Sequence, residues 1–472
     1  MRKAILTSLL ALACVCTNAQ RFTLDEVIRL AQDSTITAHM NQDALLGAEW
    51  AYKEFAASRK PQLMFELNPG YQKITSEPGT HYYKLRNYNM LNTFAELRLE
   101  QKALGLGGSF YASTGALWTE FFNDQTQNRV FSTVPIGLGY ANDLIGFNEH
   151  KWEKQINDFR YASAGKEYDY ELALIALKAA GYYLDCYVAK ARYDICADNA
   201  EVSRQLLEVG REKFAIASIS RNELSALELQ SLNAENTLFA SRQEMEAARG
   251  RLLSYLQIPD HGQKLDLSAP AAPESKSFDL AALTAAAKEN NPAFRKSREN
   301  IISAREKADR ARVESRFLQA GLDINLGIQN NAPTFGAAYG SQQPFVMSGL
   351  SLRIPIFDGG LAKSRSKLAQ YNLARAEDSE AETARQLELE VGLALREFNI
   401  QQELLQRTGL ALSLADESFE LARELYANGE TDINTFTLAG NRKDEAHTNY
   451  LNSLKNYWIS YFTLKSLCVE GL

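Results

Sequence analysis

The chain has 472 residues, with 51 basic and 58 acidic side chains and a formal net charge of -7 at pH 7. A mildly acidic chain offers no broad basic surface, so we expect no nucleic-acid partner. By length the chain could form two or three ordinary domains. Linkers rich in Pro and Gly that would separate such domains are missing, except in the stretch 258–277.

The N-terminus has the pattern of a secretory signal peptide, residues 1–19. Arg2 and Lys3 precede an apolar run that ends at Cys16, and small residues follow up to Ala19. The run is too short for a membrane anchor, which needs roughly 20 apolar residues. We therefore predict export with cleavage after Ala19, and a lipoprotein modified at Cys14 stays open as the alternative.

The rest of the chain lacks a stretch of about 18 apolar residues, so we expect no membrane-spanning helix. A closed β-barrel is the other structure that can cross a bilayer. Three cysteines remain after cleavage. Cys186 and Cys196 lie ten residues apart on one predicted helix, about 15 Å, which is too far for a disulfide. With Cys468, they are predicted to be small buried hydrophobic side chains.

Two halves of the chain carry the same order of predicted elements. Phe22–Ala31 resembles Phe278–Ala287, and each segment opens a long polar helical stretch. This similarity predicts an internal two-fold repeat, with residues 20–257 and 278–472 as its two copies. Each repeat is predicted to form, in this order, a helix, several strands, a long helix, a turn and a returning helix. The strands are expected within 62–141 and 320–357, the long helices within 146–210 and 359–428, and the returning helices within 221–257 and 432–468.

The strand segments alternate between apolar and polar residues, as in Leu322, Ile324, Leu326 and Ile328. A soluble β-sandwich alternates equally well. These strands, however, are few, lie between very long helices and cannot close a barrel within one chain. Strands pooled from three chains, four to six from each, would give a barrel of about 12 to 18 strands. The first half also has room for an additional hairpin, with its turn at Gly105–Gly108.

The long helices carry apolar seams that predict extended helix packing. In the second half, one seam runs from Ala384 to Tyr426 at spacings of three and four. In the first half, two seams begin at Tyr170 and Leu172. A helix in a rod needs one seam, whereas a helix in the wall of a ring needs a neighbour on each side.

Both long helices are expected to end at similar turns, Lys213–Ser220 and Leu425–Asp432. Gly429 can take the left-handed conformation that stops a helix. Ser220 or Asp432 can cap the helix that returns.

With these turns the chain resembles the TolC family of outer-membrane efflux proteins over nearly the whole mature sequence. One matching stretch runs from Leu350 to Gly360, and its last seven residues, from Ile354 onwards, are the most specific match. Its end forms a predicted strand-to-helix junction, in which Pro355 stops strand pairing and Asp358 caps the helix. The junction residues are Pro355, Phe357, Asp358, Gly359 and Gly360. The two glycines permit the chain to change direction sharply.

The resemblance implies a mainly α protein with a membrane β part. Long coiled-coil helices would form a periplasmic α-barrel, and the strands would contribute to a trimeric outer-membrane β-barrel, with 258–277 in a girdle around the tunnel. It implies a passive conduit of a tripartite efflux or type I secretion system in the outer membrane. The implied partners are a homotrimer, outer-membrane lipid, a periplasmic adaptor (membrane fusion) protein and an inner-membrane transporter of RND or ABC type.

The resemblance also implies that residues near the second turn can close the periplasmic end of the channel as a gate. Family members with acidic rings carry them just after this turn, where the present chain has Thr435 and Leu438, and the family's arginine falls on Thr431. An acidic ring is therefore not expected. The candidate gate residues are instead Tyr426, Asp432, Asn434, Phe214 and Ser218, with Gly429 at the tip of the turn. Simple turn capping is the alternative role for them.

Two other classes of function compete with the conduit. An exported coiled-coil structural or adhesin protein without a pore is the main alternative. An enzyme is disfavoured because no nucleophile elbow or Walker loop occurs, and we expect no catalytic residue, metal or cofactor. No pair of histidines has the spacing of metal ligands. The five histidines are His39, His81, His150, His261 and His447. The transported substrate is left open.

Overall fold

The computed structural model describes residues 21–76, 86–122, 127–260, 266–270, 276–316, 318–428, 430–431 and 433–469. The predicted signal peptide and Cys14 lie outside this range. The chain divides into two compact units. The helical unit contains residues up to 45, 165–295 and 384 onwards, and the sheet unit contains 46–164 and 296–383.

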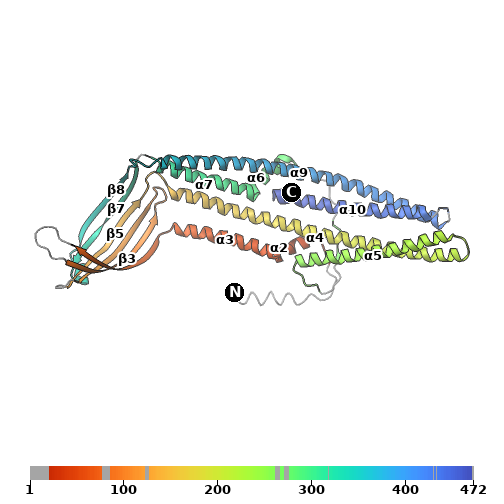
Figure 1. The fold of residues 1–472 in the computed structure, drawn as a ribbon, viewed down its shortest axis with the longest axis horizontal. Helices are drawn as coiled ribbons and strands as arrows, with labels where there is room; N and C mark the ends of the chain where they lie inside the picture. Colours follow the sequence, from red (N-terminus) through yellow and green to blue (C-terminus); the bar gives the residue numbers. More distant parts are fainter. Residues whose placement is uncertain are drawn as a thin grey trace. The chain divides into compact units, whose positions relative to one another are not determined.

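Four helices of each half follow one another in the same order and have matching lengths (Figure 1). The first half has α2 (Leu24–Ser34), α3 (Ile36–Ser58), α4 (Glu149–Ala215) and α5 (Arg221–Tyr255). The second half has α6 (Leu280–Asn290), α7 (Pro292–Glu314), α9 (Leu361–Ala427) and α10 (Ile433–Cys468). The paired lengths are 11 and 11, 23 and 23, 67 and 67, and 35 and 36 residues.

A break divides the opening helical stretch of each half, which the sequence patterns did not indicate. Thr35 and Asn291 both have extended backbones between two helices. The Oγ1 atom of Thr35 accepts a hydrogen bond from the Ala38 amide at 3.2 Å. The Oδ1 atom of Asn291 accepts one from the Ala293 amide at 2.9 Å. Each break therefore also caps the helix that follows.

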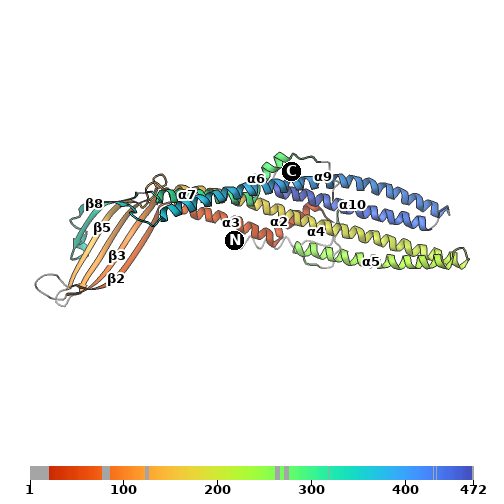
Figure 2. The same cartoon turned by 45° about the horizontal axis from the view of Figure 1, so that its top comes forward.

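In the helical unit, α5 lies beside α4 and α10 lies beside α9, each as an antiparallel hairpin (Figure 2). The predicted seam of α9 faces inwards, since Leu387, Val391 and Phe398 are buried. The ring of Phe398 contacts the rings of Tyr457 and Tyr461 of α10. Helix packing along the predicted seam is thus confirmed.

A short piece of the stretch 258–277 joins this core. Strand β1 (Arg21–Phe22) pairs in parallel with β6 (Asp266–Leu267), and Leu267 is buried. The buried Tyr183 hydroxyl of α4 lies 2.6 Å from the Ser268 carbonyl oxygen and 3.0 Å from that of Phe22, to either of which it can donate. Residues 261–265 and 271–275 of this stretch lie outside the described ranges.

Helix α4 corrects one expectation about membrane-spanning helices. It contains an 18-residue window that is long and apolar enough to cross a membrane, so the sequence is less polar there than expected. Half of that window is buried inside the protein. The core helix of a folded domain meets the same criteria, and α4 carries Tyr183 and Leu184 in the core.

The sheet unit is built around six antiparallel strands in the order β2-β3-β4-β5-β7-β8. The strands are β2 (Gln62–Ser76), β3 (Arg86–Lys102), β4 (Ser109–Phe122), β5 (Gln127–Asn142), β7 (Gln319–Ala332) and β8 (Gln343–Arg353). The hairpin turn expected at Gly105–Gly108 joins β3 to β4, where the Ala103 amide bonds the Gly108 carbonyl oxygen at 2.9 Å.

Two features of this sheet differ from expectation. The last strand was expected to reach residue 357 but ends at Arg353, because Pro355 cannot donate to a ladder. A short helix, α8 (Phe335–Ala338), lies between β7 and β8 and was not expected. The described cysteines are all free, with Cys186 and Cys468 buried as expected and Cys196 only half-buried.

Candidate functional site

The sheet has one face, here called the apolar face, on which large hydrophobic side chains are open to solvent. On β2, Leu63, Phe65 and Leu67 point to this face, and their side chains are 64%, 68% and 55% exposed. The cross-strand register continues the face over the other strands. Its further members include Leu97, Leu99, Ile136, Leu138, Leu326, Val346, Leu350 and Leu352. An exposed apolar area of this extent is typical of a site that contacts another protein or a membrane.

Aromatic side chains lie at both ends of the apolar face. Phe110 and Tyr140 contact each other at one end, with ring centroids 4.9 Å apart. Trp118 and Phe131 stack at the other end, with centroids 6.4 Å apart. Along β4, Phe110 and Trp118 are separated by about 26 Å at 3.3 Å per residue. This spacing is comparable to the apolar band of about 25 Å between the aromatic girdles of outer-membrane barrels.

The opposite face of the sheet, here called the polar face, carries charged side chains. Glu66 lies directly across from Glu96, which alone would be unfavourable. Arg98, two residues further along β3, places its guanidinium 3.9 Å from the centre of the Tyr111 ring. The Tyr111 ring covers Gly139, where a Cβ atom would come within 2.1 Å of the ring. Gly139 is thus required for this stack.

The two outer strands of the sheet, β2 and β8, each have one edge without a partner in the described chain. Pro69 of β2 and Pro344 of β8 have no N–H to donate. Prolines fit a strand where the missing donor points to an open edge. Both open edges therefore still present most of their backbone donors and acceptors.

The predicted strand-to-helix junction is formed as expected at the level of the backbone. Gly359 and Gly360 take positive φ values of 62° and 85°. The Asp358 carboxylate accepts hydrogen bonds from the Gly360 and Ala362 amides, at 2.9 and 2.8 Å. The bond from Ala362, followed by that from Gly360, holds the pKa of Asp358 below its usual value. Pro355 is half-buried, whereas Phe357 is 91% exposed.

The first tip turn follows α4. Ala217 has a left-handed backbone, with φ of 55°. The Ser218 amide bonds the Lys213 carbonyl oxygen at 2.8 Å, and the Ala217 amide bonds that of Phe214 at 2.9 Å. This is the Schellman pattern of helix termination. Ser220 then caps α5, as predicted, in a capping box with Glu223.

Of the gate candidates on this first turn, Phe214 is 38% exposed and Ser218 is exposed. The Arg221 guanidinium lies 6.0 Å from the Phe214 ring centre. On the second turn, Tyr426 stacks on the buried Phe436, with ring centroids 5.2 Å apart, and Asn434 is exposed. Asp432 and Gly429 lie outside the described residues. The gate assignment therefore stays a prediction.

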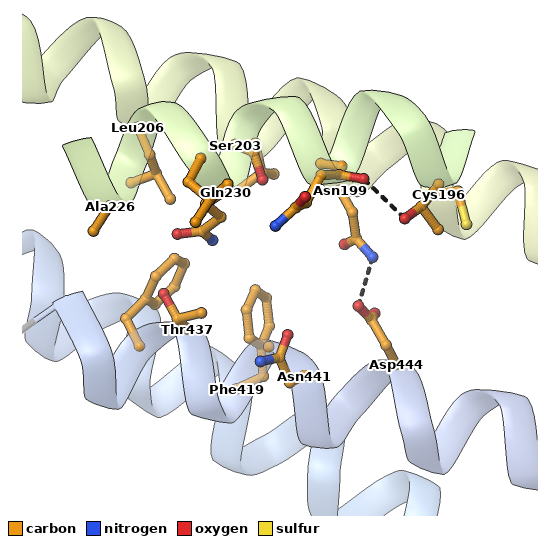
Figure 3. Close-up of a pocket in the computed structure, with 17 residues that line it drawn as sticks. Cys196, Asn199, Ser203, Leu206, Ala226, Gln230, Phe419, Thr437, Asn441 and Asp444 are labelled. Atoms are coloured by element: carbon orange, nitrogen blue, oxygen red, sulfur yellow. Dashed lines mark hydrogen bonds between the residues drawn. The ribbon is translucent and has the colours of Figure 1, made fainter. Parts of the chain in front are cut away.

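A cavity of about 560 Å³ lies between the two helical hairpins (Figure 3). Phe419 and Leu206 give it apolar walls, and Gln230 and Asn441 line it from the two different hairpins. The Asn199 side-chain amide donates to the Asp444 carboxylate at 2.5 Å. Burial raises the pKa of Asp444. Among the described residues no group of three His, Cys, Asp or Glu side chains could hold a metal ion.

Sequence patterns missed the stack of Arg98 on Tyr111 and the cavity around Asp444. Both depend on which strands or helices become neighbours. Alternation along β3 does place Arg98 with Glu96 and Glu100 on one face, so the charge of that face was accessible to sequence reasoning. The contact with Tyr111 required the register between β3 and β4.

Comparisons with known proteins give one family and a consistent set of folds. Residues 283–468 match the model of the family described as outer membrane efflux protein. Among proteins of curated function, none matches the sequence. The resemblance to the TolC family is thus confirmed, with the family match in the second half of the chain.

Three solved outer-membrane channels have a similar fold. The VceC protein of Vibrio cholerae has a TM-score of 0.65 at 14% identity, covering 95% of this chain and 96% of its own. The Campylobacter jejuni channel CmeC has a TM-score of 0.65 at 14% identity, covering 94% and 85%. The Neisseria gonorrhoeae channel MtrE has a TM-score of 0.62 at 14% identity, covering 95% and 89%.

Proposed function

We propose that this chain, whose residues 283–468 match the outer membrane efflux protein family, is a member of that family and joins two further copies to form one passive conduit. Members of the family are channels of the outer membrane with a large periplasmic portion, and they are not enzymes. A chain of this kind needs no catalytic residue. Its selectivity would come from the width and polarity of the conduit.

The observation that carries the proposal is the sheet with an exposed apolar face and two open edges. A bilayer accepts strands only when every backbone group is paired, which requires a closed barrel. One chain leaves β2 and β8 unpaired, so the ring must be closed by other copies. The polar face, with Glu66, Glu96 and Arg98, would then line the lumen.

The helices support the same arrangement, because α9 carries a second apolar seam that this chain does not cover. Leu389, Leu393 and Leu404 are 64%, 54% and 41% exposed on α9. Phe239 of α5 is 68% exposed, and Val209 of α4 is 41% exposed. Helices of neighbouring copies would cover these side chains in a periplasmic α-barrel.

The internal repeat belongs to this proposal. Corresponding helices of the two halves have matching lengths, and breaks occur at Thr35 and Asn291 in equivalent positions. A duplicated unit gives each copy two similar hairpins, so three copies supply six to the wall of the tunnel. This near-symmetry supports a ring over an open rod.

Family membership also underlies the proposed partners. A periplasmic adaptor and an inner-membrane transporter of RND or ABC type would deliver the substrate and the energy. The exported structural or adhesin protein without a pore is the competing function. It would use the same long helices but would not need a sheet whose apolar face is open.

The function is tested by single-channel recording in planar lipid bilayers with protein purified from outer membranes. We expect discrete conductance steps, because three copies enclose a water-filled lumen. Alanine at Tyr426, Asp432 and Asn434 together should raise the open probability if these residues restrict the periplasmic end. Asp378→Ala, on the exposed surface of α9, is the control and should behave as the unchanged protein.

Folded trimers that give no conductance in this experiment would favour the structural protein and contradict the conduit. Unaltered conductance and drug sensitivity in the triple variant would refute the gate assignment alone.

A further inference from the structure

We propose the register in which neighbouring copies join: β8 of one copy pairs antiparallel with β2 of the next, with Leu352 opposite Leu63 and Leu350 opposite Phe65. The proposal rests on the proposed function, since it specifies how its conduit closes. It gives a barrel of three six-stranded sheets with a wide aqueous lumen.

The stagger of the observed strands supports this register. A line that crosses the sheet through directly paired residues begins at Gln62, the first residue of β2. It passes Glu100, Tyr111, Gly139 and Asn325, and it reaches β8 at Met347. Met347 lies six residues before Arg353, the last residue of β8. The sheet therefore shifts by about one residue per strand.

A closed barrel requires such a shift, because its strands tilt from the barrel axis. If Arg353 lies opposite Gln62 of the next copy, the shift is six residues for every six strands. With a rise of about 3.3 Å per residue and strands about 4.8 Å apart, the tilt becomes about 35°. This tilt lies at the lower end of the range observed for barrels, about 35 to 45°.

The chemistry of the two edges fits the same pairing. Pro69 and Pro344 lie on the apolar face, and their missing donors would point to the open edges, so the apolar-face residues on both edges carry the free donors and acceptors. In this register Pro69 lies opposite Val346 and Pro344 opposite Tyr71, so each proline omits one hydrogen bond of the joint, a cost shared by every register that keeps the two faces in phase. Leu352 with Leu63 and Leu350 with Phe65 would then form hydrogen-bonded pairs. These pairs also continue the apolar face without a gap.

Shifts by two residues also keep the faces in phase but fit less well. One shift places Arg353 opposite Lys60, before β2 begins, and lowers the tilt to about 25°. The other gives a tilt of about 42°, also within the range for barrels, but places Leu63 opposite Ile354, beyond the end of β8. The proposed register is the one that aligns the observed ends of both strands.

The size of the conduit follows from the strand count. With three copies of a six-stranded sheet, a spacing of about 4.8 Å and a tilt of about 35° give a barrel radius near 17 Å at the Cα atoms. Barrels of 16 to 18 strands leave an aqueous channel. The membrane exit would therefore pass bulky hydrated solutes, and discrimination by size would have to occur elsewhere in the conduit.

Engineered cysteines test the register. Ser351 and Met64 would face each other in a pair without hydrogen bonds on the polar face, where Cα atoms are about 4.5 Å apart and a disulfide can form. Because these residues lie on opposite edges of one sheet, the bond must join two copies. We expect S351C/M64C to give covalent trimers on a non-reducing gel after mild oxidation.

The matched controls are S351C/Q62C and S351C/E66C, which place the second cysteine two residues away on the same face. Their Cα atoms would be about 7 to 8 Å apart, too far for efficient bonding. The single variants S351C and M64C should remain uncrosslinked. Preferential crosslinking of either control pair would overturn the register, as would crosslinking of none, even where single-channel conductance upholds the conduit.

The lumen size is tested by adding polyethylene glycols of graded size to the crosslinked channels. Polymers that are too large to enter leave the conductance unchanged, and small ones reduce it. We expect the cut-off of a barrel roughly 20 Å across inside its side chains. If the periplasmic turns set a smaller cut-off, it should be found only for addition from the periplasmic side. A small cut-off from both sides would contradict the wide exit.

Discussion

At the scale of single residues, Asp358 determines where α9 begins after the end of β8. Its carboxylate accepts hydrogen bonds from the Gly360 and Ala362 amides. Gly359 and Gly360 supply the left-handed backbone that the turn requires. Strand pairing stops before Pro355, which has no N–H to donate. A single acidic side chain and two glycines then start the helix.

Replacing Asp358 tests this cap through its pH dependence. The lowered pKa means that the ionised carboxylate stabilises the fold, fully so above the pKa of an unfolded aspartate, about 3.9. The stabilisation is lost as the pH falls through the lower pKa of the folded state. Asp358→Ala should therefore lower the melting temperature at pH 7, and the difference from the unchanged protein should shrink at pH 3.

Circular dichroism of the detergent-solubilised protein measures both values. Asp378→Ala, an exposed aspartate on the same helix, is the control and should show little change at either pH. An equal loss for Asp358→Ala at pH 7 and pH 3 would mean that the carboxylate does not act as a charged cap.

Single residues also show what the sequence could predict and what it could not. The caps at Ser220 and Asp358 were predictable, because a cap acts on amides within a few residues of itself. The left-handed Ala217 was not, since an Ala gives no local sign of that conformation. The stack of Arg98 on Tyr111 depends on the pairing of two strands, which alternation within one strand does not determine.

At the scale of elements, α9 is held by the seam that the sequence predicted. Phe398 is fully buried among the rings of Phe278, Tyr457 and Tyr461. Three segments far apart in the chain therefore meet at one side chain.

Truncation of this side chain should weaken the helical unit. Phe398→Ala removes most of a buried aromatic ring, a change that typically costs about 3 to 5 kcal/mol in folded domains. Chemical denaturation followed by helical circular dichroism measures the loss. Arg396→Ala, an exposed neighbour on α9, should change stability by less than about 0.5 kcal/mol. Similar small losses for both variants would contradict the assignment of the seam to the core.

Periodicity predicted the long helices and most strands because both patterns are local and strongly amphipathic. Periodicity did not predict the breaks at Thr35 and Asn291. Each break interrupts the helix for only one residue, and the side chain of that residue caps the helix that follows. The short α8 was missed for a similar reason, because it occupies four residues within a loop.

At the scale of the whole molecule, the central claim is that several copies share one hollow body. Its basis is the sheet, in which β2 and β8 are open and the apolar face is exposed. Open edge strands and exposed apolar faces favour uncontrolled association unless a defined partner covers them. Closure of a ring satisfies both requirements at once, and the lipid then covers the outer surface.

The most direct test of this claim is the native mass of the protein extracted from outer membranes in mild detergent. Native mass spectrometry should give a complex of three chains after the detergent is removed in the gas phase. The same chain should not be recovered from the soluble periplasmic fraction. A folded, water-soluble single chain in that fraction would contradict the shared conduit.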